Sequence, residues 1–350
     1  MHFGSDNWAG IAPEILEALA VANDGAAPGY GDDALTRRVQ QRFTEVFETD
    51  CATFLVPTGG AANGLALSVL TPPYGMILCH EASHVQTDEC CGPEFLTGGA
   101  KLVGVPGRDG KVSVDGVSGV LESFPNHPPH SAPVAALTIT QGTECGTVYE
   151  VEEIRALSAF ARSRDMALHM DGARFANAVV STGATPAELS WKAGVDVLSF
   201  GGTKNGCMAA EAVVFFDRAL VRDFEYRRKR AGHLLSKMRF MAAQFDAYLS
   251  GGLWLELAAN ANAMAARLSS GLAALNGVTI CYPTQINEVF AAFPDGVAGR
   301  LRDAGAAFYP WVTPGDRAAG RMNRLIASFR TREEEVEAFL ALVRETLSGD

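Results

Sequence analysis

Short apolar runs alternate with amphipathic stretches between about residues 50 and 216. Runs of this length, separated by segments long enough for a crossover helix, are typical of βαβ units and a mainly parallel sheet. We therefore predict an α/β fold whose large domain holds a seven-stranded sheet. The predicted strands are Ala52–Val56, Met76–Cys79, Leu102–Val105, Val134–Thr140, Ala167–Met170, Val195–Phe200 and Ala212–Phe216.

Helical periodicity fills the gaps between these strands and dominates the chain after Asp217. We predict helices over Ala61–Leu70, Glu152–Arg164 and Pro186–Lys192, the last with Thr185 as its N-cap. Long helices are expected over roughly 217–250 and 253–275, and Thr331-Arg332-Glu333-Glu334 reads as the capping box of a final helix. We divide the chain into a large domain, residues 1–250, which includes an N-terminal helical segment, and a small C-terminal α/β domain, residues 251–350.

Composition narrows the class of protein. The 350 residues carry a net charge of −11, so the overall field repels phosphate backbones and anionic membrane surfaces. No segment approaches the roughly 20 uninterrupted apolar residues of a membrane helix, and the first residues lack the pattern of a signal peptide. The seven cysteines are scattered, with no C-x-x-C spacing. We expect a cytoplasmic protein with reduced cysteines, and neither nucleic acid nor a membrane as its partner.

A glycine pair follows the first predicted strand. The segment Thr58-Gly59-Gly60-Ala61-Ala62-Asn63 lies between that strand and the helix that runs to Leu70. Glycines let backbone N–H groups approach an anion, and a helix N-terminus adds partial positive charge. A phosphate site is the functional interpretation, and ordinary turn chemistry is the alternative that this segment alone leaves open.

Two further groups follow later strands of the same predicted sheet. Asp171-Gly172-Ala173-Arg174 comes after Ala167–Met170, and Lys204 lies in the glycine-rich segment 199–206. Ligands of open α/β sheets gather at the carboxyl ends of strands. An anion cradle, a carboxylate for a pyridine nitrogen and a lysine for an imine are together what a pyridoxal-phosphate enzyme needs. The sequence therefore predicts pyridoxal 5'-phosphate as the cofactor, held by Lys204 as a Schiff base.

At these residues the chain resembles a known family over essentially its full length, the low-specificity L-threonine aldolases. They form part of the β-eliminating lyase group, within the aspartate-aminotransferase-like, fold type I class of pyridoxal-phosphate enzymes. The resemblance rests on Gly4-Ser5-Asp6, Tyr30-Gly31-Asp32-Asp33, Pro57-Thr58-Gly59, His84, Asp171-Gly172-Ala173-Arg174 with Asn177-Ala178 after it, and Thr203-Lys204. It implies cleavage of an L-β-hydroxy-α-amino acid to glycine and an aldehyde. Threonine, allo-threonine and an aryl serine such as phenylserine remain open as the preferred substrate.

The resemblance also implies roles for single residues. Lys204 would carry the cofactor, Asp171 would pair with the pyridine nitrogen, and His84 would stack on the ring. The cofactor contacts would be completed by Thr58, Gly59, Gly60, Arg174, Thr203, Lys229 and Arg239. The substrate would be bound by Ser5, Arg174, Arg324 and Tyr30, with Tyr30 reaching the site of a neighbouring subunit in a homotetramer built from dimers.

The base that takes the β-hydroxyl proton is less clearly indicated. Many relatives have a histidine in the turn that corresponds to residues 143–146, and this chain has Glu144. Either His84 accepts the proton, directly or through water, or Glu144 does so with a raised pKa; the ordinary pKa of histidine favours His84. A second departure is Gly60, where relatives commonly have threonine, so a hydroxyl contact to the phosphate is either missing or supplied by Thr58.

Three alternatives remain open. His80-Glu81-Ala82-Ser83-His84 matches the H-E-x-x-H pattern of zinc proteases, which requires both histidines on one continuous helix. Here an apolar, strand-like run leads directly into His80, so we expect no metal. The same aspartate and lysine also support another pyridoxal-phosphate lyase or an aminotransferase acting on a small amino acid. A protein that binds the cofactor without turnover is the third alternative.

Overall fold

Two β-sheets form the centre of the structure. The structure is a computed structural model, and it describes residues 1–124, 127–312 and 322–349. The strands are Ala52–Val56 (β1), Met76–His80 (β2), Lys101–Val105 (β3), Val134–Thr140 (β4), Ala167–Gly172 (β5), Val197–Gly201 (β6), Glu211–Phe215 (β7), Thr279–Ile280 (β8), Glu288–Ala292 (β9), Tyr309–Pro310 (β10) and Met322–Ile326 (β11). The large sheet has the order β1-β7-β6-β5-β4-β2-β3, and the small one has the order β10-β11-β9-β8.

The large sheet is parallel from β3 to β6, and β7 runs antiparallel to both β6 and β1. The expected α/β architecture with a mainly parallel seven-stranded sheet is thus confirmed. Each predicted strand lies within one or two residues of the observed one. The small sheet is antiparallel throughout.

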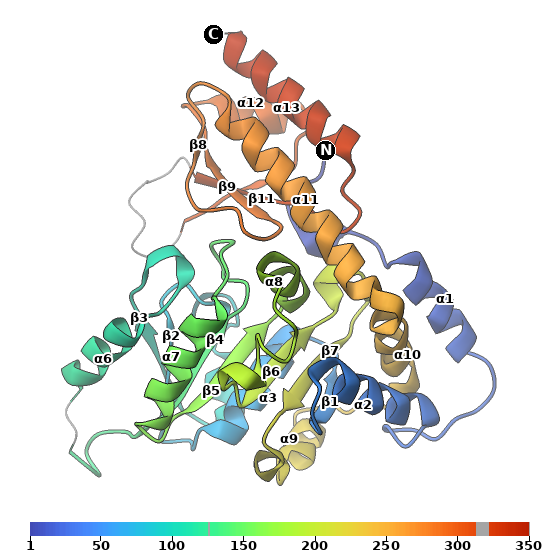
Figure 1. Ribbon diagram of the computed structural model, residues 1–350, viewed down its shortest axis with the longest axis vertical. Coiled ribbons are helices and arrows are strands. Elements are labelled where there is room, and N and C mark those ends of the chain that lie inside the picture. The colour runs from blue at the N-terminus through green and yellow to red at the C-terminus, as the bar shows by residue number, and fades with distance from the viewer. Residues whose placement is uncertain (125–126, 313–321, 350) are drawn as a thin grey trace.

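Helices cover both faces of the large sheet (Figure 1). The α-helices are Pro13–Ala22 (α1), Ala34–Phe47 (α2), Gly59–Leu70 (α3), His84–Thr87 (α4), Gly92–Thr97 (α5), Val114–Ser123 (α6), Val151–Arg162 (α7), Phe175–Thr182 (α8), Phe224–Arg230 (α9), Met238–Tyr248 (α10), Leu253–Ala273 (α11), Val297–Asp303 (α12) and Glu333–Ser348 (α13). Short 3-10 helices that bear on the site are Asp6–Trp8 (η1), Trp191–Ala193 (η3) and Thr203–Asn205 (η4).

The central strands are buried on both sides, which explains why they read as continuous apolar runs. On β7, Val213 and Phe215 pack with α3 and α9, while Val214 points to the opposite core, where α2, α8 and α10 contribute side chains. Successive residues of a strand point to opposite faces, so this single strand contributes to two cores. The sheet is packed between two layers of helices, and this packing fixes the positions of the loops that leave its strands.

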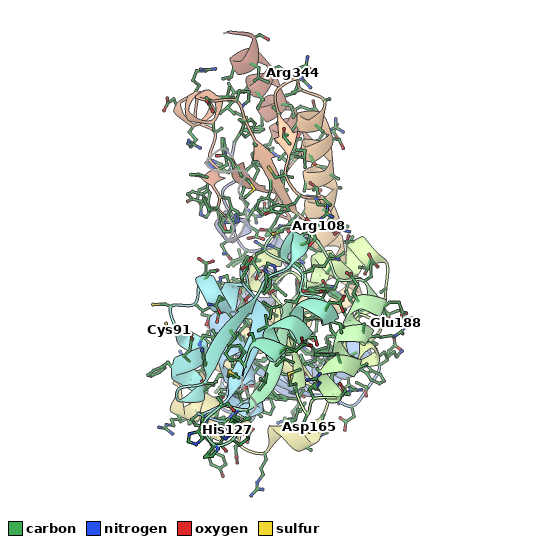
Figure 2. The ribbon with its side chains drawn as sticks, turned by 90° about the vertical axis from the view of Figure 1, so that its left-hand side faces the viewer. Cys91, Arg108, His127, Asp165, Glu188 and Arg344 are labelled. Carbon is green, nitrogen blue, oxygen red and sulfur yellow. The ribbon has the colours of Figure 1, made fainter. Side chains whose placement is uncertain are left out.

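The small lobe has a core of its own. Residues of α11, α12, α13 and the small sheet form it, and Phe3 from the N-terminus joins them. The backbone N–H of Phe3 donates to Ala307 O at 2.8 Å, and the N–H of Ile326 donates to Phe3 O at the same distance. Figure 2 shows this lobe, with Arg344 on it, standing on the larger lobe that carries Cys91, Asp165 and Glu188. Both chain ends therefore belong to one lobe.

The prediction of a helix over Pro186–Lys192 is wrong. Thr185 does cap the segment, since its Oγ1 accepts from the Glu188 N–H at 3.2 Å, but residues 186–190 form only turns before η3. Trp191 Nε1 donates to Phe47 O at 2.6 Å, and Gly194 takes φ +100 three residues later. Tertiary anchoring and a left-handed glycine stop the helical ladder before it can propagate.

The long helical stretch predicted over roughly 217–250 is helical but interrupted. It is divided into a 3-10 turn at Arg218–Val221, α9 and α10, with a loop over residues 231–237. Gly232 takes φ +81 just after α9, a conformation that cannot continue a right-handed helix. The prediction over 253–275 is confirmed by α11. The last helix is present as α13, but Glu335 rather than Glu334 accepts the capping N–H, from Arg332 at 3.0 Å.

The H-E-x-x-H residues do not share a helix. His80 is the last residue of β2, and His84 is the first residue of α4. Nε2 of His80 lies 3.1 Å from Gly107 O. The described residues contain no group of three or more His, Cys, Asp or Glu side chains arranged to hold a metal ion. None of the helices within the described ranges is long and apolar enough to cross a membrane.

Candidate active site

A cavity of about 290 Å³ opens at the carboxyl edge of the large sheet. Loops that follow β1, β4, β5 and β6 contribute to its wall, as expected for an open α/β sheet. Predicted site residues that line it are Thr58, Gly59, Gly60, His84, Glu144, Asp171, Arg174, Thr203 and Lys204. It is also lined by Asn7, Pro57, Asn63, Thr140, Gly142, Ala173 and Glu211. The structure thus brings most of the predicted residues together.

The head of α3 forms one end of the cavity. Thr58 is the N-cap, and its Oγ1 accepts from the Ala61 N–H at 3.2 Å. A Cβ atom added at Gly59 would meet nothing within 4 Å, so space is open beside the first helical turn. Backbone N–H groups and the helix dipole make this the natural position for an anion.

Asp171 is fixed near the end of β5. Its Oδ1 accepts from the Ala173 N–H at 2.9 Å, and its Oδ2 accepts from Asn63 Nδ2 at 2.8 Å. The residue is only 4% exposed. Two donors on a buried carboxyl fix its direction.

Lys204 lies on the turn that follows β6, the strand next to β5. Gly201 is required just before this turn, because a Cβ there would lie 2.5 Å from Ala173 O. Asn205 anchors the turn from below, since its Nδ2 donates to Tyr248 Oη and to Trp254 O, both at 2.8 Å. The lysine is therefore carried by a tightly packed segment and projects into the same cavity as Asp171.

Glu211 is a second carboxyl near Lys204 that the sequence did not reveal. It begins β7, opposite Gly201 in the sheet, and it accepts from the Thr203 N–H at 3.4 Å. Burial raises the pKa of Glu211 to about 7, while the hydrogen bond from Thr203 and the charge of Lys204 lower it.

His84 is held by two glutamates. Its backbone N–H donates to Glu144 Oε1 at 2.7 Å, and its Nδ1 lies 2.9 Å from Glu89 Oε1. The hydrogen bond with Glu89 is the main reason that the pKa of His84 is raised; burial opposes this. Oε1 of Glu144 also accepts from Thr140 Oγ1 at 2.9 Å. Burial and then the charge of Asp171 raise the pKa of Glu144 to about 7.

Arg174 points from the end of β5 toward the small lobe and meets two carboxylates. Its Nε donates to Asp6 Oδ2 at 2.9 Å, and its Nη2 lies 3.3 Å from Glu288 Oε1. Burial alone would lower the pKa of Arg174, yet the charges of Asp6 and Glu288 raise it overall. Arg324, on β11, has its guanidinium 3.9 Å from the centre of the Trp311 ring, and burial lowers its pKa.

Five predicted residues lie outside the lining of the cavity. Arg324 is connected to it through the charges of Glu288 and Arg174. Ser5 caps η1 and borders a different hollow, beside Trp8. Tyr30 is 51% exposed, and Nζ of Lys229 lies 4.7 Å from its ring centre. Arg239 donates to Gly25 O and lines a larger surface hollow of about 610 Å³ between α1, α2 and α10.

The sequence missed several groups that complete the site. They are Asp6, Asn63, Glu89, Glu211 and Glu288. Asn63 could have been found, since a polar residue in the first turns of α3 lies near the glycine pair. Glu89 and Glu288 are brought in by tertiary folding from a loop and from the small sheet, and no local pattern marks them.

The residues present fit pyridoxal phosphate. An anion site, a fixed carboxyl and a primary amine meet in one cavity, from adjacent parts of the same sheet edge. Asn63 Oδ1 and Glu144 Oε2 are buried and have no hydrogen-bond partner among the described residues. Orphaned polar atoms in a cavity wall call for a polar ligand. Thr58, Gly59 and Gly60 would face the phosphate, Asp171 the ring nitrogen and Lys204 the aldehyde carbon.

Comparison with known proteins gives consistent relatives. Residues 2–295 match the family described as beta-eliminating lyase. The chain is 43% identical to a low specificity L-threonine aldolase of Pseudomonas sp. strain NCIMB 10558, over 99% of this chain and 98% of that protein. It is 44% identical to the low specificity L-threonine aldolase of Pseudomonas aeruginosa, over 90% of each. The solved structure of a Leishmania major threonine aldolase superposes with a TM-score of 0.91, at 27% identity and 98% coverage of both chains.

Proposed function

We propose, from the premise that this chain belongs to the beta-eliminating lyase family, that it is a pyridoxal-phosphate-dependent aldehyde-lyase. Its reaction is the aldol cleavage of β-hydroxy-α-amino acids such as threonine, which yields glycine and an aldehyde. The observation that carries the proposal is the meeting of Asp171, Lys204 and the head of α3 in one cavity. The 43% identity to a threonine aldolase over nearly the whole chain supports this choice of reaction.

The cofactor is held by this chain at three points. When bound, pyridoxal phosphate withdraws electrons from Cα of an attached amino acid through its protonated ring. Asp171, oriented by Asn63 and the Ala173 N–H, keeps the ring nitrogen protonated. Lys204 would hold the cofactor at its aldehyde carbon. The N–H groups at the head of α3 bind the phosphate.

Orientation of the substrate selects the bond that breaks. The cofactor would activate only the bond to Cα that is aligned with it, so the grip on the α-carboxylate would decide which bond breaks. Arg174 lines the cavity, and Arg324 stands behind it on the small sheet. We assign the α-carboxylate to these two guanidinium groups.

Cleavage also needs a base for the β-hydroxyl proton. As that proton leaves, the O–H electron pair forms the carbonyl of the aldehyde, and the Cα–Cβ pair remains with Cα. The proton lost from oxygen is balanced by the one that Cα gains to become glycine. His84 and Glu144 both line the cavity, and either lies within it as a candidate base.

We extend the proposal to L-configured substrates, a cytoplasmic location and a homotetramer built from dimers. All cysteines in the described residues are free, which suits a reducing compartment. Tyr30, Lys229 and Arg239 lie outside the cavity of their own chain, as residues that complete a neighbouring subunit's site would.

The test incubates the purified holoenzyme with β-hydroxy amino acids of defined configuration and measures glycine and aldehyde release. We expect equimolar glycine and aldehyde, with no product from Lys204→Ala. Borohydride reduction of the native holoenzyme should fix the cofactor on the peptide that contains Lys204. Release of pyruvate, transfer of the amino group or racemisation without cleavage would instead favour another pyridoxal-phosphate reaction.

A further inference from the structure

A continuous chain of side-chain hydrogen bonds joins Asp171 to His84. Asn63 Nδ2 donates to Asp171 Oδ2 at 2.8 Å and to Glu89 Oε1 at 2.7 Å. The same Glu89 oxygen lies 2.9 Å from Nδ1 of His84. Asn63 and Glu89 come from α3 and from the loop after α4, so two separate elements are fixed to each other at the cavity wall.

Glu89 is well placed to control the imidazole. Its side chain is only 3% exposed, whereas that of His84 is 43% exposed. A buried carboxylate that faces one ring nitrogen requires a proton on that nitrogen, because an unprotonated Nδ1 would leave two acceptors in contact. The other nitrogen, Nε2, makes no hydrogen bond with any of the described residues, and His84 lines the cavity.

We propose that Glu89 is a positioning residue that fixes the proton of His84 on Nδ1 and thereby makes Nε2 the base for the β-hydroxyl proton of the substrate. This inference rests on the proposed aldol cleavage. It also resolves which of the two candidate groups accepts the proton. The arrangement places a carboxylate, an imidazole and a substrate hydroxyl in series, in which the carboxylate stabilises the imidazolium that forms.

Glu144 has a different task in this arrangement. Its Oε1 accepts both the His84 N–H and the Thr140 hydroxyl, which ties the backbone of His84 to the end of β4. Glu144 thus holds the histidine from the main chain, and Glu89 holds it from the ring. Together they fix both the position and the tautomer of one side chain.

Charged groups around His84 determine how the rate of cleavage depends on pH. Glu89, Glu144, Asp171 and Lys204 are the titratable groups that approach it from the surrounding elements. Glu89 raises the pKa of His84 most, Asp171 adds to this, and burial and Lys204 oppose it. Removing the charge of Glu89 should therefore lower the pKa of His84. Because histidine must be neutral to act as a base, the acidic limb of the rate profile should then move to lower pH.

The test compares Glu89→Gln and Glu89→Asp with the native holoenzyme. For Glu89→Gln we expect kcat for cleavage to fall roughly 10- to 100-fold with KM little changed, because base catalysis is weakened and binding is not. The acidic limb of kcat should move to lower pH. Glu89→Asp, which keeps the charge, should recover part of the rate. Glu81→Gln, in the neighbouring loop, is the matched control and should behave as the native enzyme.

Two further readouts separate this role from a structural one and from failure of the proposed function. In NMR titrations of histidine-labelled holoenzyme, with the His84 signal identified by its loss in His84→Phe, Glu89→Gln should lower the pKa of His84. Exchange of the glycine α-proton with deuterated solvent involves no β-hydroxyl and should persist in Glu89→Gln. Exchange absent from the native enzyme would refute the proposed function. An unmoved acidic limb, or equal loss of exchange and cleavage in Glu89→Gln, would overturn the role of Glu89.

Discussion

Single carboxyl groups do much of the positioning in this site. Oε2 of Glu144 is buried and has no hydrogen-bond partner among the described residues. Burial penalises the charged form of such a carboxyl, so the protonated form is favoured. Its titration is therefore coupled to the stability of the fold.

Glu144→Gln should change how stability depends on pH. The pKa of Glu144 is raised to about 7 in the folded chain from an ordinary value near 4.5, so the folded state binds this proton more tightly. The stabilisation it brings is present at low pH and is lost as pH rises from about 4.5 through 7. Glutamine keeps a neutral side chain at every pH. We expect the variant to gain stability relative to the native chain between pH 5 and pH 8, by on the order of 1–3 kcal/mol.

Urea unfolding of both proteins at the two pH values measures this difference. Glu334→Gln, which neutralises an exposed acid at the start of α13, is the control and should show no such trend. If Glu144→Gln and the native chain keep a constant difference from pH 5 to pH 8, the carboxyl does not titrate in this range.

At the residue scale, the sequence predicts those site residues that come directly after a strand. Asp171 and Lys204 each come just after a buried apolar run, so the sheet itself predicts that they meet. Glu89 shows why the rest could not be predicted. It is an acid in a polar loop five residues after His84, and the packing of α3 against that loop brings it to Asn63.

At the scale of elements, the turn that carries Lys204 depends on helices from a distant part of the chain. Asn205 is buried and donates to Tyr248 on α10 and to the backbone of Trp254 on α11. The lysine is thus fixed against α10 and α11 as well as the sheet.

Asn205→Ala should therefore affect both stability and cofactor binding. Two buried acceptors lose their donor, which costs about 1–3 kcal/mol. The freed turn should also lower the occupancy of the cofactor, measured by its absorbance after dialysis. Asn260→Ala is the matched control, because Asn260 Nδ2 also makes two hydrogen bonds, in its case to the backbone carbonyls of Phe329 and Thr331. It should lose stability but keep its cofactor; equal cofactor loss in both variants would contradict the argument.

Elements of the large sheet were predictable to within two residues because its strands are buried on both faces and are bounded by glycine or polar turns. The errors fall where tertiary contacts override local pattern. The helical stretch expected over roughly 217–250 is interrupted in two ways. Gly232 takes a positive φ, and the carbonyl of Ser236 in the following loop accepts from the Tyr30 N–H. Periodicity cannot reveal a break of this kind, because the flanking residues remain good helix formers.

At the scale of the whole molecule, the two lobes meet in a buried set of charges. Arg174 follows β5 as the N-cap of α8, Glu288 and Arg324 belong to the small sheet, and Asp6 comes from the N-terminal segment. Asn287 Nδ2 also donates to Asp6 Oδ2 at 3.1 Å, which ties that segment to the small sheet. The family resemblance predicts both arginines as ligands of the substrate carboxylate but gives no sign that acids lie beside them.

Glu288→Gln tests how this compensation affects the substrate. Two acids and two arginines balance in charge, so an incoming α-carboxylate competes with Glu288 for Arg174. Replacing the acid by its neutral isostere leaves one positive charge in excess beside the cavity. We expect the holoenzyme to bind glycine roughly threefold to tenfold more tightly, measured by the change in cofactor absorbance. The variant should also lose on the order of 1–3 kcal/mol of stability, because a buried ion pair is weakened.

Opposite signs in affinity and stability distinguish this effect from simple damage to the site. General loosening of the lobe interface would weaken glycine binding and stability together, and that outcome would refute the competition between Glu288 and the substrate. Glu337→Gln removes an acid that pairs with Arg267 on the exposed side of the small lobe, and it should change neither quantity appreciably. Because both variants carry the same change in net charge, a difference between them in glycine affinity reports the position of Glu288 and not the overall field of the protein.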